Sequence, residues 1–220
     1  MFQLRNHQNT VIDILSKNRK GQIIVPTGGG KTMCMIEDAK KVSGTIVVVA
    51  PRILLAEQLS SEFLEHNLDG NYNQSVSVMH VHSGETMHFS STKASDVCMW
   101  DRYTRGDKII FTTYHSLHRI QESCIHVDTI YFDEAHNSIQ KNFIEAVEYF
   151  SIYADRCYFF TATPKHSNTP MKVGMNDWDI FGEVLINVPA PQLVDEGHIL
   201  PPKVIIKDID VIDDSRFSYE

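Results

Sequence analysis

The chain reads Pro26-Thr27-Gly28-Gly29-Gly30-Lys31-Thr32 between a short apolar run at residues 22–25 and a helical pattern at residues 31–42. Glycines at such a turn leave backbone N–H groups free to cradle phosphate oxygens. The lysine can reach the outer phosphates and the threonine hydroxyl can hold Mg²⁺. Strand, glycine turn and helix in this order predict a phosphate site at a helix N-terminus. A glycine-rich turn without a ligand is the simpler alternative, and the Lys-Thr ending argues against it.

A second informative run, Asp133-Glu134-Ala135-His136, follows the apolar residues 130–132. We expect Asp133 to bind Mg²⁺, directly or through a water, and Glu134 to polarise the attacking water as general base. Lys31 completes this catalytic set by holding the phosphates. Acids at the end of a strand are often merely solvated, so this run indicates a catalytic role only in combination with the glycine turn upstream. Together the two runs predict binding and hydrolysis of a nucleoside triphosphate.

The bulk composition is that of a globular protein with one α/β core. Hydrophobic residues make up 42% of the chain, and 28 acidic residues against 20 basic ones leave a net charge of −8. This balance provides no basic surface of the kind that indicates nucleic-acid binding, so any such binding must come from local groups. The scattered cysteines form no Cys-x-x-Cys pair, which favours buried thiols in a reducing compartment.

The sequence shows no sign of a membrane segment. No apolar stretch has the length of a membrane span, and the N-terminal residues 1–5 do not resemble a signal peptide. We therefore expect no membrane partner. The expected location is cytoplasmic, or nucleoid- or virus-associated within a cell.

Apolar runs alternate with helical patterns along the chain. Strands are expected at residues 22–25, 45–50, 76–81, 108–112, 129–132 and 157–161, and helices at residues 31–42, 54–67, 94–103, 114–122 and 139–149. The runs 46–49 and 109–111 are apolar throughout, which is typical of parallel strands covered on both faces. The alternation predicts an α/β domain of the doubly wound or P-loop type, with a mostly parallel central sheet and helices on both faces.

The remaining segments have weaker patterns. Ser91-Thr92 and Asn137-Ser138 are expected to cap the helices that follow them. Residues 82–93 and 165–179 are expected to be irregular connections. An additional strand, helix and strand are expected at residues 181–186, 190–196 and 202–209.

Clusters of glycine, polar and charged residues lie where the expected strands end. They occupy residues 27–32, 51–52, 112–113, 133–136 and 161–164, at the ends of all the expected strands between residues 22 and 161 except the one at 76–81. Ligands of parallel α/β sheets bind at the carboxyl ends of the strands. We therefore predict one composite site at that edge.

These motifs resemble, in order and spacing, the first RecA-like domain of superfamily 2 DEAD/DEAH-box helicases. The resemblance is greatest to the branch with type III restriction motor subunits and related phage helicases. The matching runs are Gly28-Gly29-Gly30-Lys31-Thr32 (motif I), Ala50-Pro51-Arg52 through Gln58 (Ia), Thr112-Thr113-Tyr114-His115-Ser116-Leu117 (Ib), Asp133-Glu134-Ala135-His136 (the DEAH form of II) and Thr161-Ala162-Thr163-Pro164 (III). Leu4-Arg5-Asn6-His7-Gln8 is similar to the adenine-reading L-R-x-x-Q element. The general P-loop pattern begins with a glycine where this chain has Val25.

The resemblance implies a fold, a RecA-like P-loop NTPase domain, and a role for each motif residue. Arg5 and Gln8 would contact the adenine of ATP. Lys31 and the N–H groups of residues 28–32 would hold the phosphates, and Thr32 and Asp133 would hold Mg²⁺. The whole cofactor-binding run is Pro26, Thr27, Gly28, Gly29, Gly30, Lys31 and Thr32. Coupling to a partner domain would come from His136, Thr161 and Thr163. The nucleic-acid backbone would be contacted by Arg52, Thr112 and Thr113, since hydroxyls, backbone N–H groups and a guanidinium can position a phosphodiester without reading sequence.

The implied activity is that of an ATP-dependent nucleic-acid helicase or translocase with ATP and Mg²⁺ as cofactors. DNA is favoured over RNA as the partner because the members that the chain most resembles handle DNA. Residues 1–210 would form the ATP-binding RecA-like domain, and residues 211–220 a tail or the start of a linker. Nothing after Thr163 resembles the motifs of a second RecA-like domain, whose arginine finger contributes about 10³–10⁵ in rate. Full ATP hydrolysis is therefore expected to need such a domain in cis or in trans.

Two other functions remain open. One is a non-motor module that binds ATP and a protein or nucleic-acid partner without productive turnover, since the chain lacks motifs of a second domain. The other, a P-loop kinase or GTPase, agrees less well with Glu134 directly after Asp133 and with Gln8 upstream.

The 11 histidines raise the question of a metal site. His80 and His82 lie on one face of an expected strand, yet no cysteine or carboxylate near them has the spacing of a structural zinc site. We expect them to be surface or loop histidines.

Overall fold

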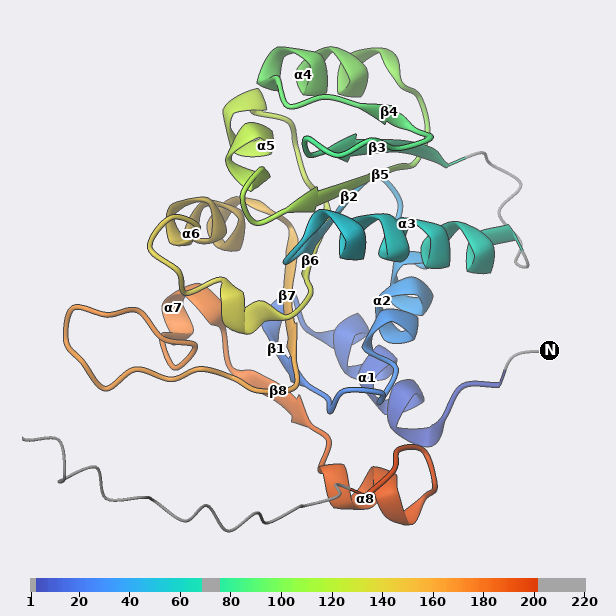
Figure 1. Ribbon diagram of the computed structural model, residues 1–220, viewed down its shortest axis with the longest axis vertical. Coiled ribbons are helices and arrows are strands. Elements are labelled where there is room, and N and C mark those ends of the chain that lie inside the picture. Colours follow the sequence, from blue (N-terminus) through green and yellow to red (C-terminus); the bar gives the residue numbers. More distant parts are fainter. Residues whose placement is uncertain (1–2, 69–75, 202–220) are drawn as a thin grey trace, which may run out of the picture.

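The computed structural model describes residues 3–68 and 76–201. These residues fold around one sheet of eight parallel strands with helices on both faces (Figure 1). The strand order is β4-β3-β5-β2-β6-β7-β1-β8. The strands are β1 (Lys20–Ile24), β2 (Thr45–Ala50), β3 (Ser77–Val81), β4 (Phe89–Ser90), β5 (Lys108–Thr113), β6 (Thr129–Phe132), β7 (Arg156–Thr161) and β8 (Val184–Asn187). The predicted fold class is confirmed.

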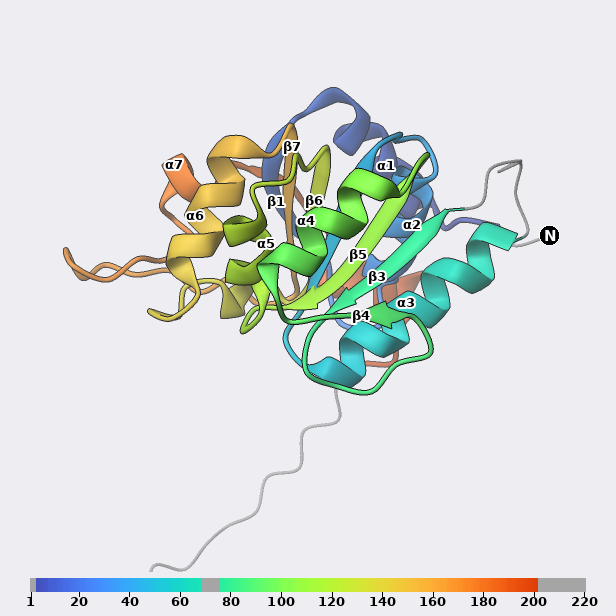
Figure 2. The same cartoon turned by 90° about the horizontal axis from the view of Figure 1, so that it is seen from above.

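The helices divide between the two faces of the sheet (Figure 2). Buried residues of α1 (Asn6–Lys17), α2 (Lys31–Ala39) and α3 (Ile53–Leu68) belong to one core cluster. Those of α4 (Ala94–Tyr103), α5 (Leu117–Ser123), α6 (Ile144–Tyr153) and α7 (Trp178–Phe181) belong to the other. A 3-10 turn, η1 (Ala135–Asn137), follows β6, and α8 (Ala190–Asp195) follows β8.

The continuously apolar strands lie in the middle of the sheet, as their composition requires. In β2, Val47 and Val49 pack in the core cluster under α4–α7, whereas Ile46 and Val48 pack under α1–α3. Alternate side chains of a strand point to opposite faces, so a strand covered on both sides needs an apolar residue at every position. Among the described residues, no helix has both the length and the apolar content needed to cross a bilayer.

Several predicted helix boundaries are wrong. The helix predicted at residues 31–42 ends at Ala39, because Lys41 N and Val42 N turn back to the carbonyls three residues earlier and tighten the last turn. The helix predicted at residues 139–149 instead spans Ile144–Tyr153, since the polar residues after Asp133-Glu134 form η1 and turns. The helix predicted at residues 114–122 begins only at Leu117. Helix α1 was not among the predicted helices.

Both predicted caps are also wrong. The N-cap of α4 is Lys93 and that of α6 is Phe143, and neither makes a side-chain capping bond. Ser91 Oγ instead accepts a hydrogen bond from Lys93 N at 3.1 Å and donates one to Asp96 Oδ2 at 2.7 Å. The connection predicted at residues 82–93 contains the short strand β4. The strand predicted at residues 181–186 begins later, as β8, and the strand predicted at 202–209 lies outside the described residues.

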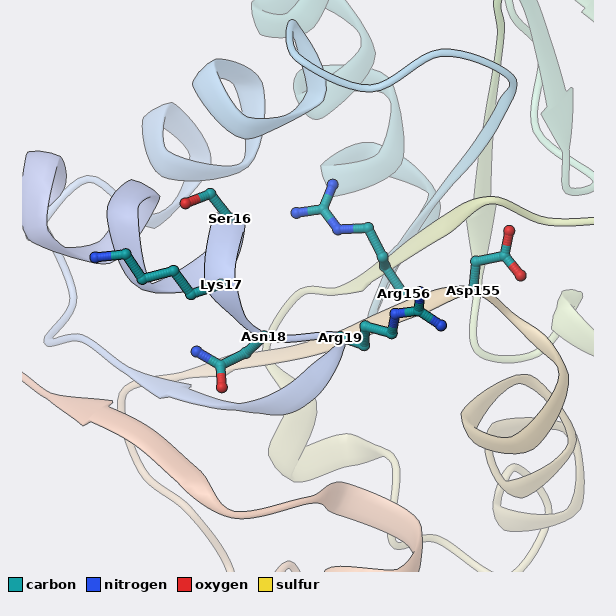
Figure 3. Close-up of a pocket in the computed structure, with 6 residues that line it drawn as sticks. All are labelled: Ser16, Lys17, Asn18, Arg19, Asp155 and Arg156. Atoms are coloured by element: carbon teal, nitrogen blue, oxygen red, sulfur yellow. The ribbon is translucent and has the colours of Figure 1, made fainter.

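A hollow of about 530 Å³ opens at the amino-terminal ends of β1 and β7 (Figure 3). Ser16, Lys17, Asn18 and Arg19 line it from the end of α1, and Asp155 and Arg156 line it from the start of β7. Its most buried cation is already bound internally, because Arg156 Nη2 lies 2.8 Å from both carboxylate oxygens of Asp38. The motif residues all lie at the opposite edge of the sheet, so this hollow is not the candidate site.

Candidate active site

The ends of β1 and β6 bring the two motif runs together. Strand β7 pairs with both β1 and β6, so the loops after these strands lie one strand apart at the same edge. Lys31 Nζ lies 3.3 Å from Glu134 Oε1, and the Lys31 side chain is buried. The structure therefore places the lysine of the glycine turn directly against the paired acids.

The glycine turn is held in place by the first turn of α1. Three successive carbonyl groups accept side-chain hydrogen bonds: Gly28 O from Arg5 Nη1 at 3.2 Å, Gly29 O from His7 Nε2 at 2.7 Å and Gly30 O from Gln8 Nε2 at 3.3 Å. The other end of the Gln8 amide is fixed as well, since its Oε1 accepts from Arg5 N at 2.9 Å. This network fixes the carbonyl side of the loop.

Fixing the carbonyls also fixes the direction of the N–H groups. In a planar trans peptide the N–H points away from the C=O of the preceding residue. The N–H groups of Gly30 and Lys31 therefore point away from α1. Lys31 also begins α2, whose first N–H groups have no partner within the helix. The result is a set of donors at a helix N-terminus, the usual environment for an anion.

Val25 fills the position where the general P-loop pattern has a glycine, and Gly29 makes room for it. Val25 is fully buried in the core below α1–α3. A Cβ atom on Gly29 would lie 2.6 Å from Val25 Cγ1 and 2.9 Å from the Pro26 carbonyl oxygen. The departure from the common pattern therefore leaves the loop intact only with glycine at position 29.

The paired acids are held by neighbouring strands and by a constrained backbone. Asp133 N donates to Val49 O at 2.8 Å, and the buried Tyr114 hydroxyl donates to Asp133 O at 2.8 Å. Glu134 has a φ of 46°, in the left-handed region that costs a residue with a side chain about 1–3 kcal/mol. Its carbonyl accepts from both the backbone N and the Nδ2 of Asn137. Such constrained conformations concentrate at functional sites.

Asp133 has a shifted pKa. Burial, and then the negative charge of Glu134, raise the pKa of Asp133 to about 6, while Lys31 acts in the opposite direction. Two adjacent acids with one buried lysine leave an excess of negative charge. A cation at this position would relieve it.

A histidine connects the acids to the loop after β7. His136 Nδ1 lies 3.0 Å from Thr161 Oγ1 and 3.4 Å from Glu134 Oε2. Thr163 N donates to Thr161 Oγ1 at 3.2 Å. Burial lowers the pKa of His136, which favours the neutral ring at neutral pH. The residues predicted for coupling are thus brought together in one chain of contacts from Glu134.

An open cleft of about 410 Å³ borders the acids. Arg52, at the end of β2, and His115, after β5, line it together with Glu134, His136 and Gln140. Arg52 and His115 are exposed, so a ligand in the cleft could reach both from solvent.

The structure does not bring the predicted threonines to this surface. Thr112 is fully buried, and its hydroxyl donates to Val81 O at 2.8 Å within the sheet. Thr113 is buried too. The expectation that their hydroxyls contact a nucleic-acid backbone is therefore corrected, because inward-facing positions of a central strand are covered by neighbouring strands and helices.

The other predicted residues lie around the glycine turn. Thr27 is exposed, Pro26 O accepts from Gly29 N at 2.9 Å, and Thr32 is half-buried in the first turn of α2. Arg5 and Gln8, which the resemblance assigns to adenine, contact the carbonyls of the loop here.

His7 is the contact that the sequence analysis missed. Its side chain is 4% exposed and its Nε2 makes the shortest of the three hydrogen bonds to the loop. A signal was available, because His7 lies four and eight residues before Val11 and Leu15, which are both buried on the same face of α1. A polar residue on an apolar stripe indicates a buried hydrogen bond.

An all-parallel sheet with a glycine loop and paired acids at its carboxyl edge is a RecA-like α/β fold of the kind found in helicase domains. The family model described as "Type III restriction enzyme, res subunit" matches residues 1–166. The chain belongs to this family. No curated protein matches the chain in a sequence comparison.

Solved structures share this fold at low sequence identity. The nuclease-deletion mutant of the Type ISP restriction-modification enzyme LlaGI, in complex with a DNA substrate mimic, has a TM-score of 0.72 and 22% identity over 90% of this chain and 21% of that chain. The Hef helicase domain of Pyrococcus furiosus has a TM-score of 0.58 and 19% identity, over 82% of this chain and 37% of that chain. The UvsW helicase of bacteriophage T4 has a TM-score of 0.57 and 14% identity, over 83% of this chain and 60% of that chain. The chain therefore spans less than two thirds of each.

Proposed function

We propose that the chain is the ATP-binding and ATP-hydrolysing part of a nucleic-acid helicase or translocase that acts on DNA. The observation that carries the proposal is the 3.3 Å ion pair between Lys31 Nζ and Glu134 Oε1 beside the glycine loop. A phosphate-binding lysine and a general base must lie this close if one triphosphate is to meet both. A second RecA-like domain, in cis or in trans, would close the other side of the nucleotide.

The groups at this edge fit a magnesium nucleotide. The excess negative charge of Asp133 and Glu134 favours a cation. Thr32 and Asp133 would hold Mg²⁺, while the N–H groups of Gly30 and Lys31 would bind phosphate oxygens. The metal ion, when bound, supplies positive charge that offsets the charge of the phosphates. Glu134 would accept the proton of the attacking water.

The cleft with Arg52 is the proposed contact with nucleic acid. A guanidinium can pair with a backbone phosphate and positions a strand without reading its sequence. Because the whole chain has a net charge of −8, such local cations must supply the attraction. The structure of LlaGI with a DNA substrate mimic supports DNA as the partner. The contacts of His136 with Thr161 and Glu134 offer a route by which the nucleotide could affect a second domain.

The Lys31→Ala variant tests the nucleotide site. We expect it to bind magnesium–ATP about 10- to 100-fold more weakly, because a hydrogen bond to a charged group contributes about 1.5–3 kcal/mol. Titration with a fluorescent ATP analogue measures the change. Lys40→Ala is the matched control, since Lys40 caps the other end of α2 and pairs with Glu37 at 2.6 Å. Equal affinity of Lys31→Ala and wild type would contradict the proposed site.

Turnover separates the motor from the non-motor alternative. Steady-state ATP hydrolysis is compared with and without single- and double-stranded DNA and RNA, using Lys31→Ala as the inactive reference. Hydrolysis stimulated by DNA supports the motor. If the chain binds ATP without hydrolysing it, a second RecA-like chain is added. Hydrolysis restored by that chain also supports the motor, in a split form. Hydrolysis that stays absent favours the ATP-binding module.

The raised pKa of Asp133 predicts a pH dependence. The carboxylate is protonated as the pH falls through about 6, and a protonated carboxyl group does not hold Mg²⁺. We therefore expect magnesium–nucleotide affinity to fall about tenfold between pH 7 and pH 5. The Asp133→Asn variant is the control, since the protonation of the nucleotide itself remains in it. An identical pH profile in variant and wild type would contradict the assignment of Asp133.

A further inference from the structure

Helix α3 and strand β3 bring one carboxylate and two histidines together, away from the candidate active site. His80 Nδ1 lies 2.9 Å from His82 Nε2, and Glu57 Oε1 lies 3.1 Å from the first nitrogen and 3.2 Å from the second. The side chains of His80 and His82 are 0% and 2% exposed. The expectation of surface or loop histidines is therefore wrong about the surface, since both side chains are buried, although His82 does lie in the turn after β3. The spacing rule missed Glu57 because the carboxylate comes from a separate helix earlier in the chain.

His80 Nδ1, His82 Nε2 and Glu57 Oε1 form a triangle of close contacts, and the ring hydrogens available cannot make all three of them favourable. Gly84 N donates to His82 Nδ1 at 3.2 Å, so the ring hydrogen of His82 is on Nε2. If the ring hydrogen of His80 is on Nε2, the lone pairs of His80 Nδ1 and Glu57 Oε1 face each other. If that hydrogen is on Nδ1, the N–H groups of His80 Nδ1 and His82 Nε2 face each other. Either tautomer leaves one of the three contacts unfavourable.

The carboxylate oxygen of this cluster is poorly satisfied as well. Glu57 Oε1 is itself buried, and no donor in the described part of the chain makes a hydrogen bond of good geometry to it. A buried acceptor left without a donor costs about 1–3 kcal/mol, and more when it is charged.

We propose that Glu57, His80 and His82 form a binding site for a divalent transition metal ion, with Zn²⁺ as the best fit. One metal ion accepts a lone pair from each of the three atoms and removes the unfavourable contact. Two imidazoles and one carboxylate are a common zinc ligand set, with a water in the fourth position. Tetrahedral zinc with bonds of about 2.0–2.1 Å separates its ligand atoms by about 3.3–3.4 Å, so each of the three separations need lengthen by only about 0.1–0.5 Å.

The surroundings of the triangle also suit a metal. His80 Nε2 lies 3.0 Å from the buried Ser60 hydroxyl, which can accept its hydrogen and fix the ring with Nδ1 free for the ion. The Glu57 side chain is 29% exposed, so it gives the ion an entrance from solvent. Binding through His82 Nε2 moves the ring hydrogen to Nδ1, so the Gly84 amide must turn away from it.

The proposed ion would fasten α3 to the end of β3. A Cβ atom on Gly84 would lie 2.4 Å from Ile53 Cγ2, so the segment after His82 packs tightly on the first turn of α3. Ile53 directly follows Arg52, which lines the cleft beside the active site. The metal would thus stabilise the segment that carries Arg52.

Metal titration of the chain, purified without a polyhistidine tag and stripped with EDTA, tests the proposal. Calorimetry with Zn²⁺ should give one ion per chain, and Co²⁺ should give the intense visible absorption of tetrahedral coordination. Glu57→Gln and His82→Gln should each weaken binding more than about 100-fold, beyond the loss typical of a group outside the coordination sphere. The matched controls are Glu62→Gln, further along α3, and His126→Gln, from an exposed cluster with Asp128 and Asp155. Both should bind as the wild type does.

Thermal unfolding keeps the test decisive if a histidine variant folds poorly. Zn²⁺ should raise the Tm of the wild type, because an ion that binds only the folded state stabilises it. The rise should disappear in Glu57→Gln, whose side chain is partly exposed and keeps its size. Absence of Zn²⁺ binding to the wild type would overturn the proposal. Binding retained by Glu57→Gln, or lost in His126→Gln, would overturn it equally.

Discussion

A Glu134→Gln variant should hydrolyse ATP about 10²–10⁴-fold more slowly than the wild type, the range that one general base contributes. Glutamine has the size of glutamate but cannot accept the proton of the attacking water. The affinity for ATP should be kept, since Lys31 loses only its 3.3 Å contact with Glu134 Oε1 and remains free to bind phosphate. Single-turnover hydrolysis and a separate nucleotide titration, with nucleic acid and a second RecA-like domain present, measure the two quantities.

The Glu134→Gln substitution should leave the local backbone conformation unchanged. The left-handed conformation of Glu134 is fixed by hydrogen bonds to its carbonyl from Asn137, and these do not depend on the carboxylate. Glu37→Gln is the matched control, because Glu37 is an acid of similar exposure that pairs with Lys40 on α2. Hydrolysis at the wild-type rate by Glu134→Gln would show that another group is the base.

An Asp38→Ala variant should lower the free energy of unfolding by about 3–5 kcal/mol, the cost of leaving a buried charge unpaired. Asp38 is 1% exposed. It accepts hydrogen bonds from Arg156 Nη2 at 2.8 Å and from the Tyr131 hydroxyl at 2.6 Å. The alanine would leave the buried Tyr131 hydroxyl without its acceptor, and Arg156 Nη2 would keep only Leu15 O, at 3.3 Å. Urea-induced unfolding followed by circular dichroism measures the loss.

The hydrogen bonds around Asp38 connect several elements, which explains the large expected loss of unfolding free energy. Arg156 Nε donates to the Tyr158 hydroxyl at 2.9 Å, and that hydroxyl donates to Leu15 O at 2.8 Å at the end of α1. Asp38 therefore helps to join α2, β6, β7 and α1. Loss of the carboxylate loosens the face of the sheet on which the glycine loop is held.

Two comparisons isolate the buried charge. Asp13→Ala removes an acid that pairs with Lys17 on the surface of α1, and it should cost less than about 0.5 kcal/mol. Replacing the network as a whole, with Asp38→Leu, Arg156→Met and Tyr131→Phe together, should recover most of the stability, because no buried polar group is then left unpaired. A small effect of Asp38→Ala alone would contradict the argument.

The sequence predicted the sheet better than the helix ends. Strands such as β2 were recognisable because a strand buried on both faces must be apolar at every position. The start of α6 was not, since residues between Asp133 and Ile144 take turns that depend on the constrained Glu134 and on hydrogen bonds from Asn137. The caps at Ser91 and Asn137 failed for a similar reason, because these polar side chains found partners other than the expected N–H groups.

By itself the sequence determined the family, the parallel sheet and the edge at which the glycine turn meets the acids. The family follows from the resemblance of the motifs, and the sheet and its edge follow from local periodicity, since parallel strands present their carboxyl ends together. Tertiary structure alone decided that His7 holds the loop, that Thr112 is buried, that Asp38 pairs with Arg156, and that Glu57 meets two histidines. Each of these depends on residues from separate elements. Their distance is set by how helices pack on the sheet, which no local pattern records.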